Sequence, residues 1–287
     1  MEAKKLRAVL LYSAGHLGSA TVFNRLLEAP EFEIVGVVRA PSIPFSQKGV
    51  RRLKKHLKKV GWRFGWLLFW QQAVQAVAFG LARVLPLPWR RLRPGWWLAR
   101  ERGIPIFHAA DVHDPKCLAY LRSREPDVLV SAYFHQILRD PVLGVPKLGI
   151  LNVHPGWLPA YRGAMCYFWV LKNGEDRGGA SVHWIDRGID TGELLARRTF
   201  RIGPGATQQR VLVLTAAIGA RLLLRVARKI LVGERPRPAP APEADARYYP
   251  MPGETDFDAY FSKRRFFRIR DVFGLLFRKL RHPGGRA

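Results

Sequence analysis

The sequence predicts an α/β fold in which helices cover both faces of a single doubly wound, mostly parallel sheet. Short, near-continuous apolar runs alternate with helical segments, as is typical of parallel strands that are buried on both faces. The 287 residues, 48% of them hydrophobic, are enough for one sizeable core or at most two. A basic, Trp-rich helical insertion and a basic C-terminal tail are expected to be added to this sheet.

The first unit is predicted to be strand, helix and strand over residues 6–40, with the helix near 15–29. Gly15 and Gly18 lie in the turn between the first strand and the helix. Their spacing is only G-x-x-G, and no acidic residue ends the second strand, so a dinucleotide site is weakly supported. A tight turn is the preferred interpretation. A phosphate of the substrate, bound at the helix N-terminus, is the alternative.

An unusual segment, residues 42–100, then interrupts the pattern. No acidic residue occurs between Glu33 and Glu101, whereas the segment holds 13 Lys and Arg residues and six of the nine Trp residues. Residues 64–82 carry no charge, which approaches the roughly 20 residues that span a bilayer. A single crossing would divide one sheet between two sides of the membrane. We therefore expect helices in the membrane interface, or a re-entrant hairpin, with a packed helical subdomain as the alternative. The Trp residues expected at headgroup depth are Trp62, Trp66, Trp70, Trp89, Trp96 and Trp97.

After the interruption the α/β pattern resumes. A pair of strands joined as a hairpin is expected over 178–202, and Thr207 is placed to cap a long helix that runs to Ile230. The other expected elements are strands at 104–109, 126–134 and 149–156 and helices at 115–124 and 163–173.

We expect three parts in the chain: a catalytic domain of residues 1–41 and 101–235, the insertion 42–100, and a linker and tail, 236–287. The tail mixes Phe, Leu, Lys and Arg, which suits an in-plane helix on anionic lipid. Docking of the tail on the protein and binding to nucleic acid are the alternatives.

The net charge of +26, from 48 Lys and Arg against 22 Asp and Glu, indicates an anionic partner, either a lipid surface or a nucleic acid. Because the charge is combined with Trp and Phe, an anionic membrane surface is preferred and tRNA is the alternative. Cys117 and Cys166 form no CxxC or Cys/His cluster, so we expect reduced thiols and no metal site. With no signal peptide, the expected location is cytoplasmic and peripheral on the membrane.

The chemistry is concentrated in the pattern N-x-H-P-G-x-L-P-x-Y-R-G, followed by an aspartate 36 residues after the histidine, in G-I-D-T-G. Asn152 and His154 can stabilise the oxyanion of a tetrahedral intermediate. Asp190 can orient His154, favour its imidazolium form and take a proton through water. Arg162 is a candidate for binding an anionic acceptor group, or for shaping the loop through a salt bridge. His183 was expected to have no role.

This constellation resembles the core of the formyltransferases that use 10-formyltetrahydrofolate, over residues 6–40 and 104–235. The resemblance implies a catalytic Asn152, His154 and Asp190, no metal, and 10-formyltetrahydrofolate as the formyl donor. It further implies substrate contacts from Gly15, Tyr161, Arg162 and Gly163. Donor contacts are expected from the strand and loop that begin at Ala132, namely Ala132, Phe134, Ile137, Leu138, Gly149 and Leu151.

Two departures from that family concern the acceptor side. Gly156 stands where many relatives have Ser, and residues 164–169 read AMCYFW where relatives often carry Pro. About fifty residues follow Gly233, too few and too helical in pattern for the β-barrel domain of methionyl-tRNA formyltransferases. The preferred acceptor is therefore a primary amine on a lipid-linked or sugar substrate at the membrane. The alternatives are a methionyl-tRNA formyltransferase-like enzyme, a formyltetrahydrofolate hydrolase, and a membrane-binding module with an inactive core.

Overall fold

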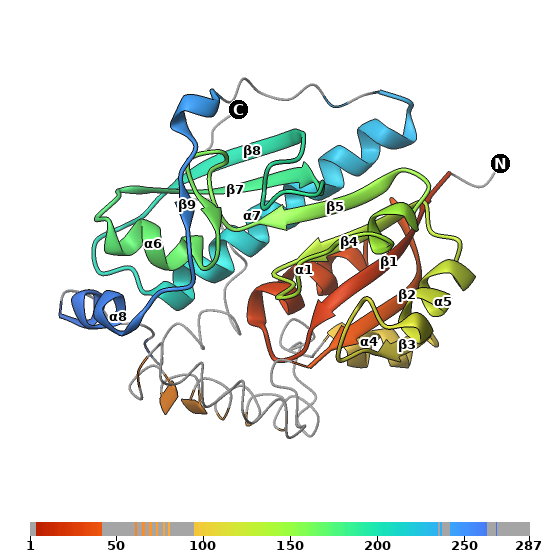
Figure 1. Ribbon diagram of the computed structural model, residues 1–287, viewed down its shortest axis with the longest axis horizontal. Coiled ribbons are helices and arrows are strands. Elements are labelled where there is room, and N and C mark those ends of the chain that lie inside the picture. Colours follow the sequence, from red (N-terminus) through yellow and green to blue (C-terminus); the bar gives the residue numbers. More distant parts are fainter. Residues whose placement is uncertain are drawn as a thin grey trace.

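The computed structural model describes most of the α/β domain and parts of the two basic segments (Figure 1). The residues described are 4–41, 61, 65, 66, 69, 70, 73, 77, 80, 95–234, 236, 242–262 and 268. The rest of the insertion and of the tail, including most of the tail's basic run, lies outside the described residues.

A seven-stranded sheet in the order β3-β2-β1-β4-β5-β7-β8 forms the centre of the molecule (Figure 1). Strands β1 to β5 pair in parallel, whereas β7 pairs antiparallel with β5 and with β8. The bounds are β1 Leu6–Ser13, β2 Phe32–Ala40, β3 Ile106–His108, β4 Val128–Ala132, β5 Gly149–His154, β7 Arg177–Trp184 and β8 Leu194–Arg201. The predicted mostly parallel sheet and its hairpin are therefore confirmed.

Helices cover both faces of the sheet because the side chains of each buried strand alternate between two cores. In β1, Leu10 and Tyr12 belong to the core on one face, which lies under helices α1 (Leu17–Leu26), α4 (Gly95–Glu101) and α7 (Gln208–Leu231). Val9 and Leu11 belong to the core on the other face, under helix α5 (Pro115–Ser123). As predicted, Thr207 caps α7 by accepting a hydrogen bond from the Arg210 amide. The helices are α1 Leu17–Leu26, α4 Gly95–Glu101, α5 Pro115–Ser123, α6 Cys166–Lys172 and α7 Gln208–Leu231, and a 3-10 turn, η2, covers Val142–Gly144.

The end of the proposed insertion differs from the expectation. Helix α4 packs on α1 and β2, and its residues Leu98 and Ala99 are buried. Trp96 packs against the core beneath the guanidinium of Arg39, at 4.4 Å, and Trp97 donates a hydrogen bond to Glu101. Trp96 is thus half-buried against the core and is not at headgroup depth, because the face of the sheet over β2 and β3 needs an apolar cover.

The beginning of the tail also packs on the domain. Strand β9, Tyr248–Tyr249, pairs in parallel with β6, Arg162–Gly163, in a second, two-stranded sheet. Helix α8, Glu254–Phe261, buries Phe257 and Tyr260 against Phe168 of α6, with ring centroids 4.9 Å apart in both pairs. Docking on the protein therefore holds for residues 248–261. The expected boundary at residue 235 stays a prediction.

Seven described residues between 65 and 80 are helical, and four of them carry large exposed apolar side chains: Trp66, Phe69, Trp70 and Val77. Trp66 and Phe69 are 58% and 59% exposed, and both rings contact Trp70. Within the described part of the chain, no helix has the length and apolar character needed to cross a membrane.

Candidate functional site

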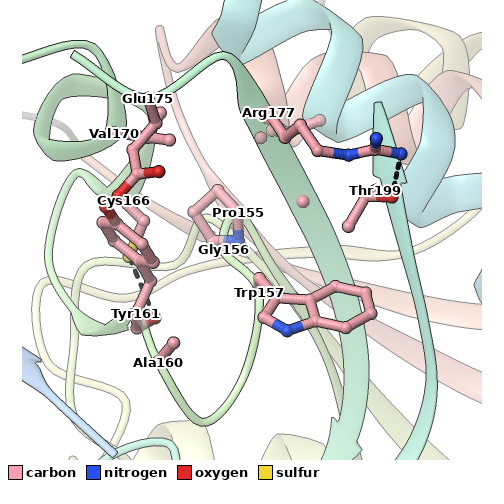
Figure 2. A pocket seen from close by; sticks show the side chains of 13 residues that line it. Pro155, Gly156, Trp157, Ala160, Tyr161, Cys166, Val170, Glu175, Arg177 and Thr199 are labelled. Carbon is pink, nitrogen blue, oxygen red and sulfur yellow. Dashed lines mark hydrogen bonds between the residues drawn. The ribbon is translucent and has the colours of Figure 1, made fainter. Parts of the chain in front are cut away.

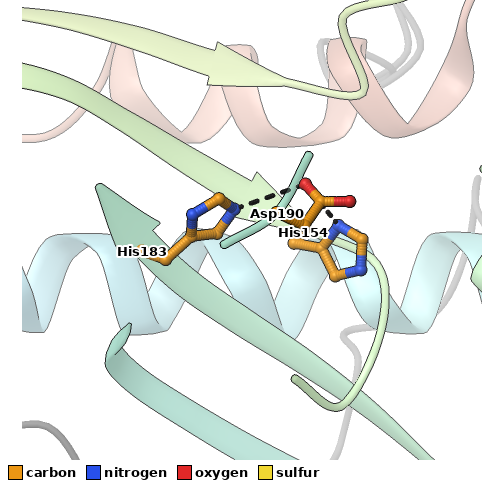
Figure 3. Close-up of side chains that lie close together, drawn as sticks. All are labelled: His154, His183 and Asp190. Atoms are coloured by element: carbon orange, nitrogen blue, oxygen red, sulfur yellow. Dashed lines mark ion pairs between the residues drawn. The ribbon is translucent and has the colours of Figure 1, made fainter. Parts of the chain in front are cut away.

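The candidate site is built where β5 ends beside β7 (Figure 3). Asn152 and His154 are two residues apart in β5, so their side chains leave the same face of the sheet. In the antiparallel pairing, Asn152 lies opposite His183 and His154 lies opposite Ser181. Asp190 comes from the turn between β7 and β8, where its positive φ of 54° aims its carboxylate at the two imidazoles.

His154 and Asp190 form a buried ion pair. Nδ1 of His154 lies 3.4 Å from Oδ1 of Asp190, and both side chains are almost closed to solvent. Burial alone lowers the pKa of His154, but the Asp190 carboxylate and Cys166 raise it well above its ordinary value. Burial raises the pKa of Asp190, yet His154 and His183 hold it well below its usual range. The pair is therefore imidazolium and carboxylate at neutral pH.

The other ring nitrogen of His154 faces the loop that follows β5. Nε2 donates a hydrogen bond to the Tyr161 carbonyl at 2.6 Å, and Cys166 Sγ lies 3.4 Å from the same nitrogen. A Cβ on Gly156 would stand 2.9 Å from His154 Nε2 and 3.0 Å from Cys166 Cβ. The two departures from the family motif, at residues 156 and 166, are thus neighbours that share the space beside His154.

His183 is the residue that sequence reasoning missed. Its Nδ1 donates to the Trp184 carbonyl at 2.7 Å, so in the neutral ring Nε2 is left to accept from the Asn152 amide nitrogen at 3.0 Å. The same Nε2 lies 3.6 Å from Oδ1 of Asp190. His183 therefore orients Asn152 and lies beside the Asp190 carboxylate. The antiparallel register of β5 and β7 is the signal that would have identified it.

Asp190 is held from its other side by β6. Its Oδ2 accepts from the Gly163 amide at 2.8 Å, and its carbonyl accepts from Nε of Arg162 at 3.1 Å. The Arg162 guanidinium also makes two bonds to Glu243, of 2.6 Å and 2.9 Å. Of the two interpretations of Arg162, the structure shows the loop-shaping salt bridge.

Tyr161 and Gly163 line the same loop, whereas Gly15 lies elsewhere on the edge where the parallel strands end. The Tyr161 hydroxyl donates to Glu175 at 2.9 Å, so its ring turns away from His154 while its carbonyl contacts it. Gly15 has a φ of 76° in the turn that follows β1. At Gly18 a Cβ would lie 2.7 Å from the Tyr133 ring, so close packing explains that glycine.

The expected donor contacts divide into two groups. Phe134 and Ile137 follow β4 at its carboxyl end and keep exposed surface, with Ile137 half exposed. Ala132, Leu138 and Leu151 are buried in the core. Gly149 begins β5 beneath Trp184, five residues before His154 and at the opposite end of the strand. The structure does not bring Gly149 to the site.

A cavity of about 250 Å³ adjoins the site on the side of α6 (Figure 2). Cys166 and residues 155–157 separate it from His154. Its walls include the Trp157 ring, the Tyr161 ring and the Arg177 side chain, which donates to Thr199. Gly156, Gly178 and Gly179 also line it.

In the described part of the chain, only one group of side chains is close enough together to hold a metal ion, namely His154, His183 and Asp190. One ligand atom from each lies within 4.8 Å of the others. Their contacts are those of an ion pair and hydrogen bonds, with Asn152 and Gly163 as further partners. The expectation of no metal stays a prediction.

Comparison with known proteins matches the part of the chain that carries the candidate site. Residues 90–227 match the formyl transferase domain family. A methionyl-tRNA formyltransferase from a Synechococcus strain is 38% identical over 176 residues, which is 61% of this chain and 52% of that protein. The corresponding enzyme of Geobacter metallireducens is 35% identical over 136 residues, 47% of this chain and 44% of that protein. The chain thus spans about half the length of the curated relatives it matches.

Solved structures share the fold at low sequence identity. Glycinamide ribonucleotide transformylase 1 from Symbiobacterium toebii has a TM-score of 0.56 at 18% identity, covering 80% of this chain and 89% of that chain. A formyltetrahydrofolate deformylase from Pseudomonas syringae has a TM-score of 0.53 at 18% identity, covering 81% of this chain and 63% of that chain. These likenesses show that the chain shares their fold.

Proposed function

We propose that this chain transfers a formyl group from 10-formyltetrahydrofolate to a primary amine, with Asn152, His154 and Asp190 as the catalytic residues. The match of residues 90–227 to the formyl transferase domain family supports the proposal. The observation that carries the proposal is the buried ion pair of His154 and Asp190 beside the amide of Asn152. A buried charge pair that is this fully hydrogen-bonded suits a reaction that develops negative charge on oxygen.

In the proposed reaction, the amine nitrogen attacks the formyl carbon, and a tetrahedral intermediate with one oxyanion forms. One amide hydrogen of Asn152 bonds His183, which leaves the second to donate to the oxyanion. Both ring nitrogens of His154 are already bonded, so its imidazolium acts through its charge. Asp190 maintains that charge and receives the amine's proton through a water. Collapse of the intermediate breaks the bond from the formyl carbon to the folate nitrogen, which takes the proton back from Asp190 through the same water and leaves as tetrahydrofolate.

The donor site is proposed to lie at the carboxyl ends of β4 and β5, the usual place for ligands in α/β sheets. Phe134 and Ile137 are the two expected donor residues with exposed apolar surface there. They are proposed to cover the donor's ring system. The buried Ala132, Leu138 and Leu151 support that surface from beneath. No donor contact is proposed for Gly149.

For the acceptor, methionyl-tRNA is the first candidate, ahead of the lipid-linked amine that the sequence analysis preferred. The curated relatives at 35–38% identity are methionyl-tRNA formyltransferases. The net charge of +26 supplies the cations that phosphate contacts require. These relatives are matched over about half their length, so the tRNA acceptor is a proposal for this chain.

A lipid-linked amine at the cytoplasmic face of an anionic membrane is the second candidate. The observation that favours it is the exposed, mutually contacting trio of Trp66, Phe69 and Trp70 in a segment without acidic residues. Aromatic side chains with basic neighbours in sequence are typical of interfacial membrane helices. Contact with RNA phosphate would instead be expected to place Lys and Arg on such a face.

The deciding experiment supplies labelled 10-formyltetrahydrofolate with methionyl-tRNA, with a total lipid extract, or with neither. Labelled tRNA or labelled lipid that disappears in His154→Ala identifies the acceptor class. Labelled formate without an acceptor indicates the hydrolase. If the wild type and His154→Ala give the same zero turnover with every acceptor, the catalytic proposal is wrong and a binding module with an inactive core remains.

A further inference from the structure

A segment that we call the strap, residues 242–250, crosses the loop of the catalytic motif. The Arg162 amide donates to the Arg247 carbonyl at 2.9 Å, and the Ala164 amide donates to the Tyr249 carbonyl at 2.9 Å. These bonds join β6 to β9 in parallel across more than eighty residues of sequence. The strap is therefore part of the folded site, although sequence alone suggested a linker.

Side chains fix the position of the strap at its far end. The Tyr249 ring stacks on Tyr161 at 4.8 Å with an interplanar angle of 8°. The Tyr249 hydroxyl accepts from Asn173 at 3.2 Å, and the next carbonyl, of Pro250, accepts from the Trp169 indole at 3.0 Å. Tyr161 is also the residue whose carbonyl accepts from His154, so the strap packs directly on the support of that imidazole.

Glu243 connects the beginning of the strap to Asp190. Both of its carboxylate oxygens bond the Arg162 guanidinium, which in turn donates through Nε to the Asp190 carbonyl at 3.1 Å. The Arg162 side chain is 15% exposed, and the Glu243 side chain is 73% exposed. A planar guanidinium held at both ends in this way has a fixed orientation. The contacts thus run from Glu243 through Arg162 and Asp190 to His154.

We infer that Glu243 is a positioning residue for the proposed formyl transfer: it holds Arg162 so that Asp190 keeps its place between His154 and His183. The inference rests on the proposed function for its kinetic consequence. Asp190 needs this support because its backbone has a positive φ of 54°, a conformation that non-glycine residues adopt at a cost. Displacement of a catalytic group by about 1 Å can reduce a rate by roughly a hundredfold.

The test compares Glu243→Gln with Glu234→Gln, which makes the same chemical change at an exposed residue outside the strap. Because Glu243 is exposed, its replacement is expected to leave folding intact. We expect kcat to fall about tenfold in Glu243→Gln while KM for donor and acceptor stays constant. Glu243→Asp should recover most of the rate, and Glu234→Gln should match the wild type.

Two kinetic results would overturn the inference. An unchanged kcat in Glu243→Gln would show that Asp190 does not depend on the strap. An unchanged kcat with a lower KM for the acceptor would show that Glu243 merely competes with an anionic group for Arg162. Zero turnover in the wild type would be a failure of the proposed function and not of this inference.

Titration of the His154 imidazole by NMR gives a readout that needs no substrate. The ionisable groups around that ring are Asp190 and His183, with the Cys166 thiol beside Nε2. If Glu243 holds Asp190 in place, the His154 pKa should fall toward its ordinary value in Glu243→Gln and stay constant in Glu234→Gln. Equal titration curves in all three proteins would refute the positioning role.

Discussion

The candidate site and the exposed aromatic trio are opposite exceptions to the usual burial of side chains: the first buries polar groups, and the second exposes apolar ones. Between β5 and β7, ionisable side chains lie almost closed to solvent. On the helical residues between 65 and 80, Trp66, Phe69 and Trp70 are about half exposed or more. Buried polar groups and exposed apolar groups are the informative exceptions to the usual pattern.

The two regions differ in how many partners their unusual side chains find within the chain. Each polar atom named at His154 and Asp190 has a partner at hydrogen-bond or ion-pair distance. The aromatic trio has only its own rings as described ring partners. The contacts of the buried site are therefore complete within the chain, whereas the trio keeps apolar surface that a partner can cover.

The largest expected effect is that of His154→Ala on turnover. Removal of the imidazolium beside the developing oxyanion should reduce kcat by about 10³-fold or more. His113→Ala is the matched control, since His113 also pairs with an aspartate, Asp111 at 2.9 Å, but lies on the surface. Steady-state kinetics with the identified acceptor provides the measurement. Equal losses in the two variants would mean that burial and placement of His154 do not matter.

A smaller loss, of about 10²-fold in kcat, is expected for Asp190→Asn, together with a lower His154 pKa. The raised pKa of His154 gives stability that is present below pH 6.5 or so and is lost as pH rises through the folded value. The lowered pKa of Asp190 gives stability that is lost as pH falls through its folded value. Urea unfolding across pH should therefore show a flatter profile in the variant. An unchanged profile would contradict the ion pair.

The strap can be tested through stability by Gly163→Ala. Gly163 has a φ of 99°, and an added Cβ would stand 2.1 Å from the Tyr249 carbonyl oxygen. A destabilisation of about 2–3 kcal/mol in the free energy of unfolding is expected, because strain and displacement of β9 add together. Gly144→Ala, where an added Cβ meets no heavy atom within 4 Å, serves as the control in urea titrations. Equal midpoints would show that β9 can move away freely.

A triple variant in which Trp66, Phe69 and Trp70 are replaced by Ser tests the role of the exposed aromatic trio. Binding to vesicles of anionic lipid should weaken by about tenfold or more, because roughly half of each ring's area is available for burial. The melting temperature of the domain should stay constant. Leu148→Ser and Val232→Ser, which also remove exposed apolar side chains, should bind like the wild type. Loss of tRNA binding with unchanged vesicle binding would assign the trio to RNA.

The smallest expected effect is that of a chelator. His154, His183 and Asp190 are close enough to hold a cation, yet their hydrogen bonds already satisfy them. Turnover should be unchanged after dialysis against EDTA. Loss of activity that returns with a divalent metal would show that the three residues form a metal site.

The sequence predicted those parts of the fold and site that depend on local pattern. Alternation within β5 placed Asn152 and His154 on one face, and Thr207 marked the start of α7. His183 was missed because its role follows from the register of an antiparallel partner strand. The strap was missed because a two-residue strand such as β9 has no periodicity, and because Arg162 and Glu243 lie 81 residues apart.

Two other differences have a common cause. The sequence does not distinguish a Trp that packs against the core, as Trp96 does, from one that faces outward, as Trp66 does. The position of a residue within a strand shows which face of the sheet its side chain leaves, but not how far the residue lies from the candidate site. For this reason Gly149 was included with the donor contacts, although it begins β5. Only the assembled sheet separates these cases.

Residues 42–100, which include most of α4, connect β2 to β3 in the sequence. These two strands are neighbours in the sheet. The chain leaves the sheet at the carboxyl end of β2 and re-enters it at the amino end of β3, and the entropy of closing a loop grows only slowly with its length. The segment between these two strands can therefore be exchanged for another while β5, β7 and the strap are untouched. Chimaeras joined near residues 41 and 95 would test whether this segment selects the amine.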